Sequence, residues 1–116
     1  MRRKKRMTLS GLRQYISELE GVHFEFDTRR QRHYDPFCPQ QGRLIFRELE
    51  ISEFMNRVVL TDNNGGNMSF GMVKYADMRE TPRGCEITLY CGVPCTGILL
   101  GTYIIFGILN TVAECV

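Results

Sequence analysis

The stretch Asp62-Asn63-Asn64-Gly65-Gly66-Asn67 is the strongest turn signal in the chain. Asparagine and glycine adopt positive φ angles at little steric cost, so this stretch predicts a hairpin between two antiparallel strands. Strand-like residues flank it on both sides, over 57–61 and over 68–75. The stretch therefore favours a fold that is built on local antiparallel pairing.

Two further segments have the period-two alternation of a half-buried strand. In residues 22–27, a valine and two phenylalanines alternate with histidine, glutamate and aspartate. In residues 85–91, two cysteines, an isoleucine and a leucine alternate with polar residues. Successive side chains of a strand point to opposite faces, so each segment is expected to bury one face. A shorter strand-like run is present at 44–46.

The first regular element is expected to be a short helix from about Thr8 to Glu20. Its apolar residues recur at steps of three and four, which places them on one helix face. These residues are Leu9, Leu12, Ile16 and Leu19. Thr8 or Ser10 is suited to cap the helix, and Gly21 is a natural stop because glycine accepts the left-handed conformation.

The last part of the chain is rich in apolar residues and has no charge between Glu86 and Glu114, a run of 27 residues. The glycines and the proline at 92–97 interrupt it, so a membrane span is not expected. We expect a central strand followed by a buried segment, and the sequence leaves open whether 98–109 is strand or helix. Apolar surface left over from the core would favour contact with a partner or with a second copy of the chain.

Together these signals predict an α+β fold, in which a short N-terminal helix packs on a mainly antiparallel, curled sheet of five to six strands or a small open barrel. Residues 1–7 are expected to form a disordered basic head, because they combine a charge run with a terminal position. Residues 8–116 are expected to form a single α+β domain, which is a usual domain size.

The composition is that of an ordinary globular protein, since 43% of the 116 residues are hydrophobic and 24% are charged. Five of the fifteen basic residues lie in 2–6, so the other ten face thirteen acidic residues, a net charge of −3. Five cysteines do not suit a paired extracellular framework, and residues 8–11 do not begin a secretory signal. We therefore expect a cytoplasmic protein with free thiols.

Residues that could support metal binding or catalysis are few. Cys91 and Cys95 flank a Gly-Val-Pro spacer that resembles a zinc knuckle, and His33 with Cys38 would complete a ligand set. However, the 85–91 pattern puts Cys91 on an apolar strand face, where cysteine behaves as a small hydrophobic residue. No serine elbow, phosphate loop or paired-carboxylate motif is found in the sequence. The sequence therefore predicts neither an enzyme nor a metal or cofactor site.

The segment 28–42 has no periodicity, and loops of this length are often functional. It combines arginines with aromatic residues, which favour interfaces because their side chains supply contact area and directed bonds together. We expect it to be the contact site of a small binding module, an adaptor, subunit or stoichiometric inhibitor, that recognises a protein partner or a second copy of the chain. The residues expected to make contact are Arg29, Arg30, Arg32, His33, Tyr34 and Phe37.

The alternative is a module that binds RNA or single-stranded nucleic acid. Arginines neutralise phosphates while aromatic faces stack on bases, and the same loop offers both. The basic head would add to the electrostatic attraction through Arg2, Arg3, Lys4, Lys5 and Arg6. The net charge of −3 outside the head argues against a broad nucleic-acid surface, so protein recognition is preferred.

Overall fold

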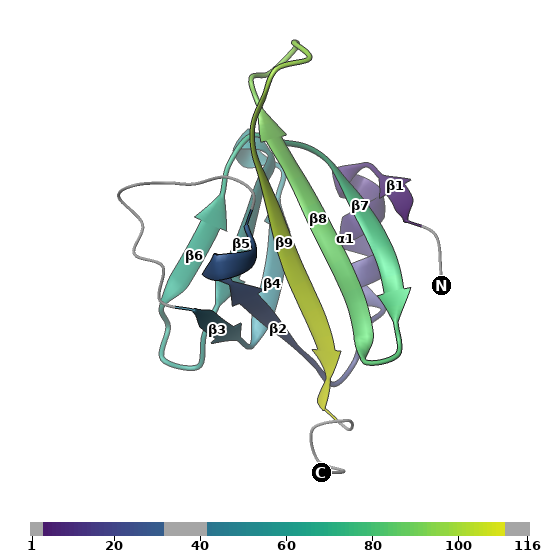
Figure 1. Ribbon diagram of the computed structural model, residues 1–116, viewed down its shortest axis with the longest axis vertical. Helices are drawn as coiled ribbons and strands as arrows, with labels where there is room; N and C mark the ends of the chain where they lie inside the picture. Colours follow the sequence, from purple (N-terminus) through teal and green to yellow (C-terminus); the bar gives the residue numbers. More distant parts are fainter. Residues whose placement is uncertain (1–3, 32–41, 111–116) are drawn as a thin grey trace.

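The computed structural model describes residues 4–31 and 42–110. One helix packs on a mainly antiparallel six-stranded sheet, which is accompanied by a second sheet of three strands (Figure 1). The predicted α+β class is therefore confirmed, with more strands than the sequence indicates.

Every strand pair is antiparallel. The six-stranded sheet has the order β1 (Lys5–Met7), β7 (Val73–Thr81), β8 (Gly84–Gly92), β9 (Leu99–Leu109), β2 (Val22–Asp27) and β3 (Arg43–Phe46). The three-stranded sheet has the order β4 (Glu48–Ser52), β5 (Arg57–Thr61) and β6 (Asn67–Phe70). The helical segments are α1 (Leu9–Ser17) and two single-turn 3₁₀ helices, η1 (Thr28–Arg30) and η2 (Phe54–Asn56).

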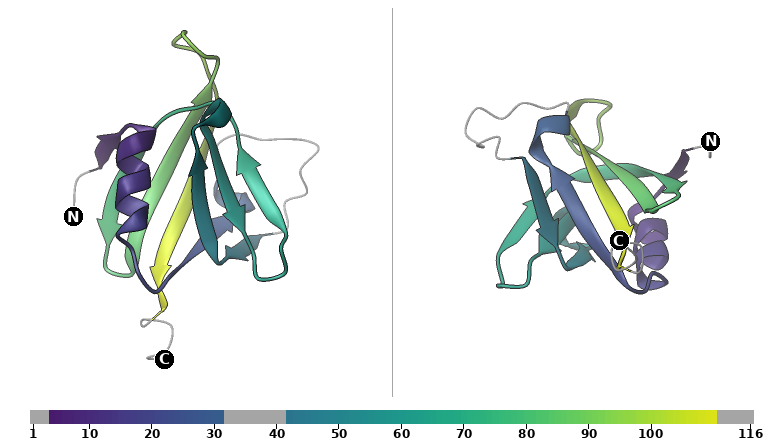
Figure 2. Two further views of the ribbon diagram at one scale, coloured as in Figure 1. Left: turned by 180° about the vertical axis from the view of Figure 1, so that it is seen from behind. Right: turned by 60° about the horizontal axis from the view of Figure 1, so that its bottom comes forward.

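The two sheets meet at the corner between β3 and β4, where the chain passes from one sheet to the other. Arg47 lies at this corner, and its backbone N–H donates to the carbonyl oxygen of Thr61 at 2.8 Å. The inner faces of both sheets and α1 enclose one hydrophobic core (Figure 2). Its fully buried members include Leu12 from α1, Leu60 from β5 and Ile105 from β9.

The helix begins where the sequence predicts and ends earlier. The Thr8 hydroxyl accepts a hydrogen bond from the backbone N–H of Gly11 at 3.1 Å, which is the expected N-terminal cap. At the other end, the N–H groups of Glu18 and Leu19 bond to carbonyls three residues back. This tighter closure ends the α-helical pattern at Ser17, and Gly21 then takes a φ of 62°.

The hairpin predicted from residues 62–67 joins β5 to β6. The Asp62 carboxylate accepts hydrogen bonds from the backbone N–H groups of Asn64 and Gly66, both at 2.8 Å. These bonds explain the turn, because an aspartate side chain satisfies backbone donors that the strand ladder leaves free.

Residues 5–7 differ from the expected disordered head, because they form strand β1. Lys5 pairs with Met78 and Met7 with Ala76 on β7. Arg6 secures the pairing: its Nε lies 3.1 Å from Oδ1 of Asp77, and its guanidinium lies 4.2 Å from the ring centroid of Tyr75. A run of positive charge indicates a solvated tail unless a carboxylate elsewhere in the chain meets it, as Asp77 does here.

The apolar run near the C-terminus forms a strand, which answers the question that the sequence left open. Strand β9 lies between β8 and β2 in the six-stranded sheet, where both of its edges are paired. A central strand with one face in the core needs few charges, which accounts for the composition. In the part of the chain that the structure describes, no helix has the length and apolar character needed to cross a membrane.

Candidate functional site

The structure describes two of the six residues predicted for partner contact, Arg29 and Arg30. Both lie in η1, directly after β2, and both are exposed. The other four, Arg32, His33, Tyr34 and Phe37, lie outside the described residues, as does Cys38. Their predicted role therefore stays a prediction.

Arg29 and Arg30 border a cavity of about 820 Å³ on the outer face of the six-stranded sheet, which we call the arginine groove. Side chains from η1, β3 and the β7–β8 hairpin bring four arginines to this groove, and β9 contributes apolar residues. Its main lining residues are Arg29, Arg30, Arg43, Arg83, Phe106, Ile108, Glu25 and Asp27.

Asp27 holds η1 in place at the edge of the groove. Its Oδ1 accepts bonds from the backbone N–H and from Nε of Arg29, each at 3.0 Å. Nε of Arg30 lies 3.8 Å from Oδ2 of the same carboxylate. The hydrogen bonds from Arg29, helped by the charges of both arginines, hold the pKa of Asp27 below its usual value. The two arginines are thus positioned by one carboxylate at the end of β2.

The centre of the groove is an aromatic ring beneath positive charge. The guanidinium carbon of Arg30 lies 5.8 Å from the ring centroid of Phe106. Nearby, Nη1 of Arg43 lies 3.4 Å from Oε1 of Glu25. Among the described residues, Arg83 has no ion-pair partner. Four arginines against two carboxylates give the groove a net positive charge, which suits a ligand with an anionic and a flat or apolar part.

A second surface lies at the end of the molecule where the β8–β9 hairpin protrudes (Figure 1). Seven large apolar side chains are exposed among the described residues, and six of them lie in three segments at this end. We call this surface the apolar end, and its members are Phe54 and Met55 of η2, Met72 before β7, and Ile98, Leu99 and Leu100 of the hairpin.

Backbone hydrogen bonds join the three segments of the apolar end. The N–H of Met72 donates to the carbonyl oxygen of Met55 at 3.1 Å. The N–H of Gly92, at the base of the hairpin, donates in turn to the carbonyl oxygen of Met72 at 3.0 Å. The exposed side chains therefore project from one connected backbone unit.

The apolar end also concentrates backbone strain. Four non-glycine residues of the described chain have positive φ angles, and all four lie in these segments: Met55 at 60°, Asn56 at 48°, Met72 at 54° and Cys95 at 61°. Asparagine tolerates this region, but a long unbranched side chain pays a steric cost there. Strain that collects at an exposed apolar surface is typical of a functional site.

The basic head contributes less free charge than the sequence suggests. Arg2 and Arg3 lie outside the described residues, and Lys4 and Lys5 are exposed. Arg6 is bound to Asp77, whose other oxygen accepts a hydrogen bond from the Tyr90 hydroxyl at 2.8 Å. This arginine therefore stabilises the sheet edge.

Of the suggested zinc ligands, the structure describes Cys91 and Cys95, whereas His33 and Cys38 lie outside the described residues. Cys91 is buried on β8, whereas Cys95 is exposed in the hairpin. Burial raises the pKa of the Cys91 thiol to about 11, so it stays protonated at neutral pH. Within residues 4–31 and 42–110, no three histidine, cysteine, aspartate or glutamate side chains gather as a metal site would require.

His23, the histidine that the structure describes, has a structural role. Nε2 of His23 lies 2.8 Å from Oε2 of Glu25, and Nδ1 lies 2.8 Å from Oδ1 of Asn110. These contacts tie the start of β2 to the end of β9 and leave both ring nitrogens engaged.

Comparison with known proteins adds no functional information. No protein-family model matches the chain, and no significant match is found among curated proteins or among solved structures. Function must therefore be inferred from the two surfaces themselves.

Proposed function

We propose that this chain is a non-enzymatic binding module that recognises a protein partner through its apolar end. The observation that carries the proposal is the gathering of six exposed large apolar side chains on three hydrogen-bonded segments. Exposing an apolar surface of this kind to water is unfavourable, and such surfaces are typical of protein contacts. Protein surfaces that bind nucleic acid are instead positively charged.

The shape of the apolar end indicates what kind of partner it fits. The β8–β9 hairpin projects beyond the body of the molecule, as Figure 1 and the left view of Figure 2 show. Two convex tips meet over a small area, whereas a stable interface buries roughly 800 Å² per partner. The fitting partner is a different protein with a concave apolar cleft, and the hairpin enters that cleft.

The backbone hydrogen bonds of the apolar end support the same function. The Met55–Met72–Gly92 hydrogen bonds join the three segments at the base of the hairpin before binding, so less conformational entropy is lost when the complex forms. The described cysteines are free thiols, and we propose a reducing location, the cytoplasm, for the complex.

The test places a photo-crosslinking residue, p-benzoylphenylalanine, at Leu99 in cells that express the chain. We expect one discrete adduct with another protein, and we expect the double substitution Ile98→Ser, Leu100→Ser to abolish it. Ile45 is the matched control position, because it is 54% exposed but lies on β3, away from the apolar end. Crosslinking there should give no such adduct.

Three results would count against this proposal. An adduct of twice the mass of the chain would show that the occupant is a second copy. Crosslinking to lipid alone would show a membrane contact, and equal adducts from Leu99 and Ile45 would show a nonspecific encounter.

The arginine groove supports a second candidate function, binding of single-stranded nucleic acid. The observation in its favour is the guanidinium of Arg30 over the ring of Phe106, beside three further arginines. Fluorescence anisotropy with a labelled oligouridylate tests it. Binding that falls steeply with salt and is lost in Arg30→Glu, Arg83→Glu would support it. Arg47→Glu, on an exposed arginine at the sheet corner, is the control.

A further inference from the structure

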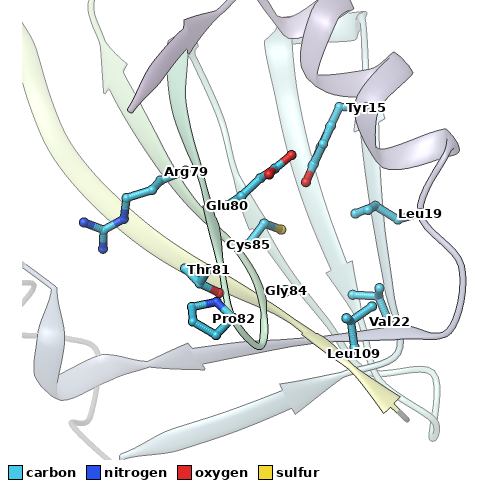
Figure 3. A pocket seen from close by; sticks show the side chains of 11 residues that line it. Tyr15, Leu19, Val22, Arg79, Glu80, Thr81, Pro82, Gly84, Cys85 and Leu109 are labelled. Atoms are coloured by element: carbon cyan, nitrogen blue, oxygen red, sulfur yellow. The ribbon is translucent and has the colours of Figure 1, made fainter. Parts of the chain in front are cut away.

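A cavity separate from the apolar end, and independent of the proposed function, lies between α1 and the β7–β8 hairpin. We call it the helix–hairpin pocket; its volume is about 730 Å³, within the range of small-molecule sites. Figure 3 shows its lining, which includes Tyr15, Leu19, Val22, Glu80, Cys85 and Leu109.

The pocket exists because two features of the fold leave part of the inner sheet face uncovered. α1 ends at Ser17, so the helix covers only one part of that face. Beyond the helix, Cys85 pairs with Gly107 across β8 and β9. A methyl group at Gly107 would lie only 2.7 Å from Sγ of Cys85, so this position favours glycine and adds no side chain to the floor of the pocket.

One side of the pocket is an apolar wall. Leu19, Val22 and Leu109 lie together there in Figure 3, and Val22 and Leu109 are paired across β2 and β9. All three side chains are half-buried, and those of Leu19 and Val22 pack against the core. A ligand in the pocket would cover apolar surface that the core leaves exposed, which is favourable in water.

Two of the lining residues, Arg79 and Glu80, are charged, and both are engaged by other groups. Nη2 of Arg79 lies 2.8 Å from Oε2 of Glu86, and in Figure 3 the Arg79 side chain points away from the cavity. Glu80 has an interaction partner of its own. Neither of these two lining residues therefore offers a free counter-ion to a ligand.

The polar side chains that face the interior of the pocket, Tyr15 and Cys85, are uncharged at neutral pH. Burial raises the pKa of Tyr15 to about 12. Burial likewise raises the pKa of Cys85, whose sulfur accepts a hydrogen bond from the Tyr15 hydroxyl. A protonated, buried thiol is a poor nucleophile, so the pocket is suited to binding rather than to covalent chemistry.

We propose that the helix–hairpin pocket binds a small, uncharged apolar molecule. Its hydrocarbon part would contact Leu19, Val22 and Leu109 and lie over the side-chain-free floor at Gly107. A cationic or anionic ligand would leave water for a site whose charged residues are already engaged, and burying a charge without a partner is unfavourable. The pocket therefore selects against charge of either sign.

The test compares three probes that share one rigid hydrocarbon cage: 1-adamantanol, 1-adamantylamine and 1-adamantanecarboxylate. At pH 7 they are neutral, positive and negative. In ¹H–¹⁵N correlation spectra, 1-adamantanol should shift the amide signals of Gly84, Cys85 and Gly107 saturably. Its dissociation constant should be at least about tenfold lower than that of either charged probe, because neither charge finds a free partner in the pocket.

A filled pocket supplies the second arm of the test. Leu19→Trp should weaken 1-adamantanol binding at least about tenfold, because the larger ring takes up the volume that the ligand needs. Ile45→Trp is the matched control, since it adds the same ring at an exposed position on β3 and should leave binding unchanged. If Leu19→Trp does not fold, Val22→Phe takes its place.

Two results would overturn the proposal. One is a charged probe that binds as tightly as 1-adamantanol, and the other is a filled variant that binds 1-adamantanol like the natural chain. Position 19 and position 45 both lie outside the apolar end, so this experiment can fail while the partner crosslink at Leu99 succeeds, and the reverse.

Discussion

Met72 donates its backbone N–H to the carbonyl oxygen of Met55, and both residues have left-handed φ angles, 54° and 60°. A side chain in that region costs roughly 1–2 kcal/mol, whereas glycine occupies it freely. At ordinary positions, alanine is more stabilising than glycine. At position 72 we expect the reverse, because Met72→Ala keeps the strain and Met72→Gly removes it.

The difference between these two variants is expected to be about 0.5–1 kcal/mol in favour of glycine, since glycine also loses more entropy on folding. Urea denaturation of both variants measures it. Because each lacks the methionine side chain, the comparison isolates the backbone. A Met72→Ala variant that is the more stable of the two would show that position 72 is not strained.

Position 84 also requires glycine. Its φ is 151°, and a methyl group there would overlap the carbonyl oxygen of Gly107 on β9. Gly84→Ala should therefore lower the free energy of unfolding by more than about 2 kcal/mol. Gly71→Ala is the matched control, because a methyl group at Gly71 meets open space. Similar denaturation midpoints for the two variants would contradict the close approach of β8 and β9.

The Arg6–Asp77 pair predicts a dependence of stability on pH. Burial alone would raise the pKa of Asp77, but hydrogen bonds from Arg6 and Tyr90 outweigh it and lower the pKa below the ordinary 3.8. A carboxylate with a lowered folded pKa stabilises the protein above its unfolded pKa. That contribution is lost as the pH falls from near 3.8 through the folded value.

Asp77→Asn should therefore destabilise the protein at pH 7, by about 1–2 kcal/mol. It should also flatten the acid limb of the stability curve between pH 5 and 2. Thermal unfolding of both proteins across that range measures the effect. Parallel curves would mean that Asp77 contributes no linked protonation.

The cysteines should differ widely in reactivity. Cys91 is buried and its pKa is raised to about 11, so its thiolate is scarce at neutral pH, whereas Cys95 is exposed in the hairpin. N-ethylmaleimide at pH 7 should label Cys95 at least about 100-fold faster than Cys91. Peptide mass spectrometry at timed intervals gives both rates. Comparable rates would show that β8 opens readily at that end.

Elements with local signals could be predicted from the sequence. The 22–27 alternation coincides with β2, and the turn at 62–67 joins β5 to β6. Strand β4 is harder to predict from the sequence, because Glu48 and Glu50 alternate with its apolar residues and glutamate is uncommon in strands. Strand β1 has no local signal, since Arg6 finds its partner 71 residues away.

The candidate surfaces likewise combine residues that the sequence indicates locally with residues that only the fold brings together. Composition alone pointed to Arg29 and Arg30, but Arg43, Arg83 and Phe106 join them only because the sheet order places β3, the β7–β8 hairpin and β9 around η1. The apolar end was anticipated only in part, because surplus apolar surface was expected from 98–109 but Phe54, Met55 and Met72 were not singled out. Its run at 98–100 matched a core strand equally well, and only the projection of the hairpin leaves those side chains exposed.

The pairing of β2 with β9 has a consequence for how the chain folds as it is made. Val22 pairs with Leu109 and Glu25 with Phe106, so one of the first strands synthesised waits for the last described strand. The β7–β8–β9 meander is local and can form as soon as it is complete, whereas β2 must close a loop of some eighty residues. Until then Phe24 and Phe26 have no permanent neighbours on that side, and a chaperone that shields them during translation would favour the native sheet over aggregation.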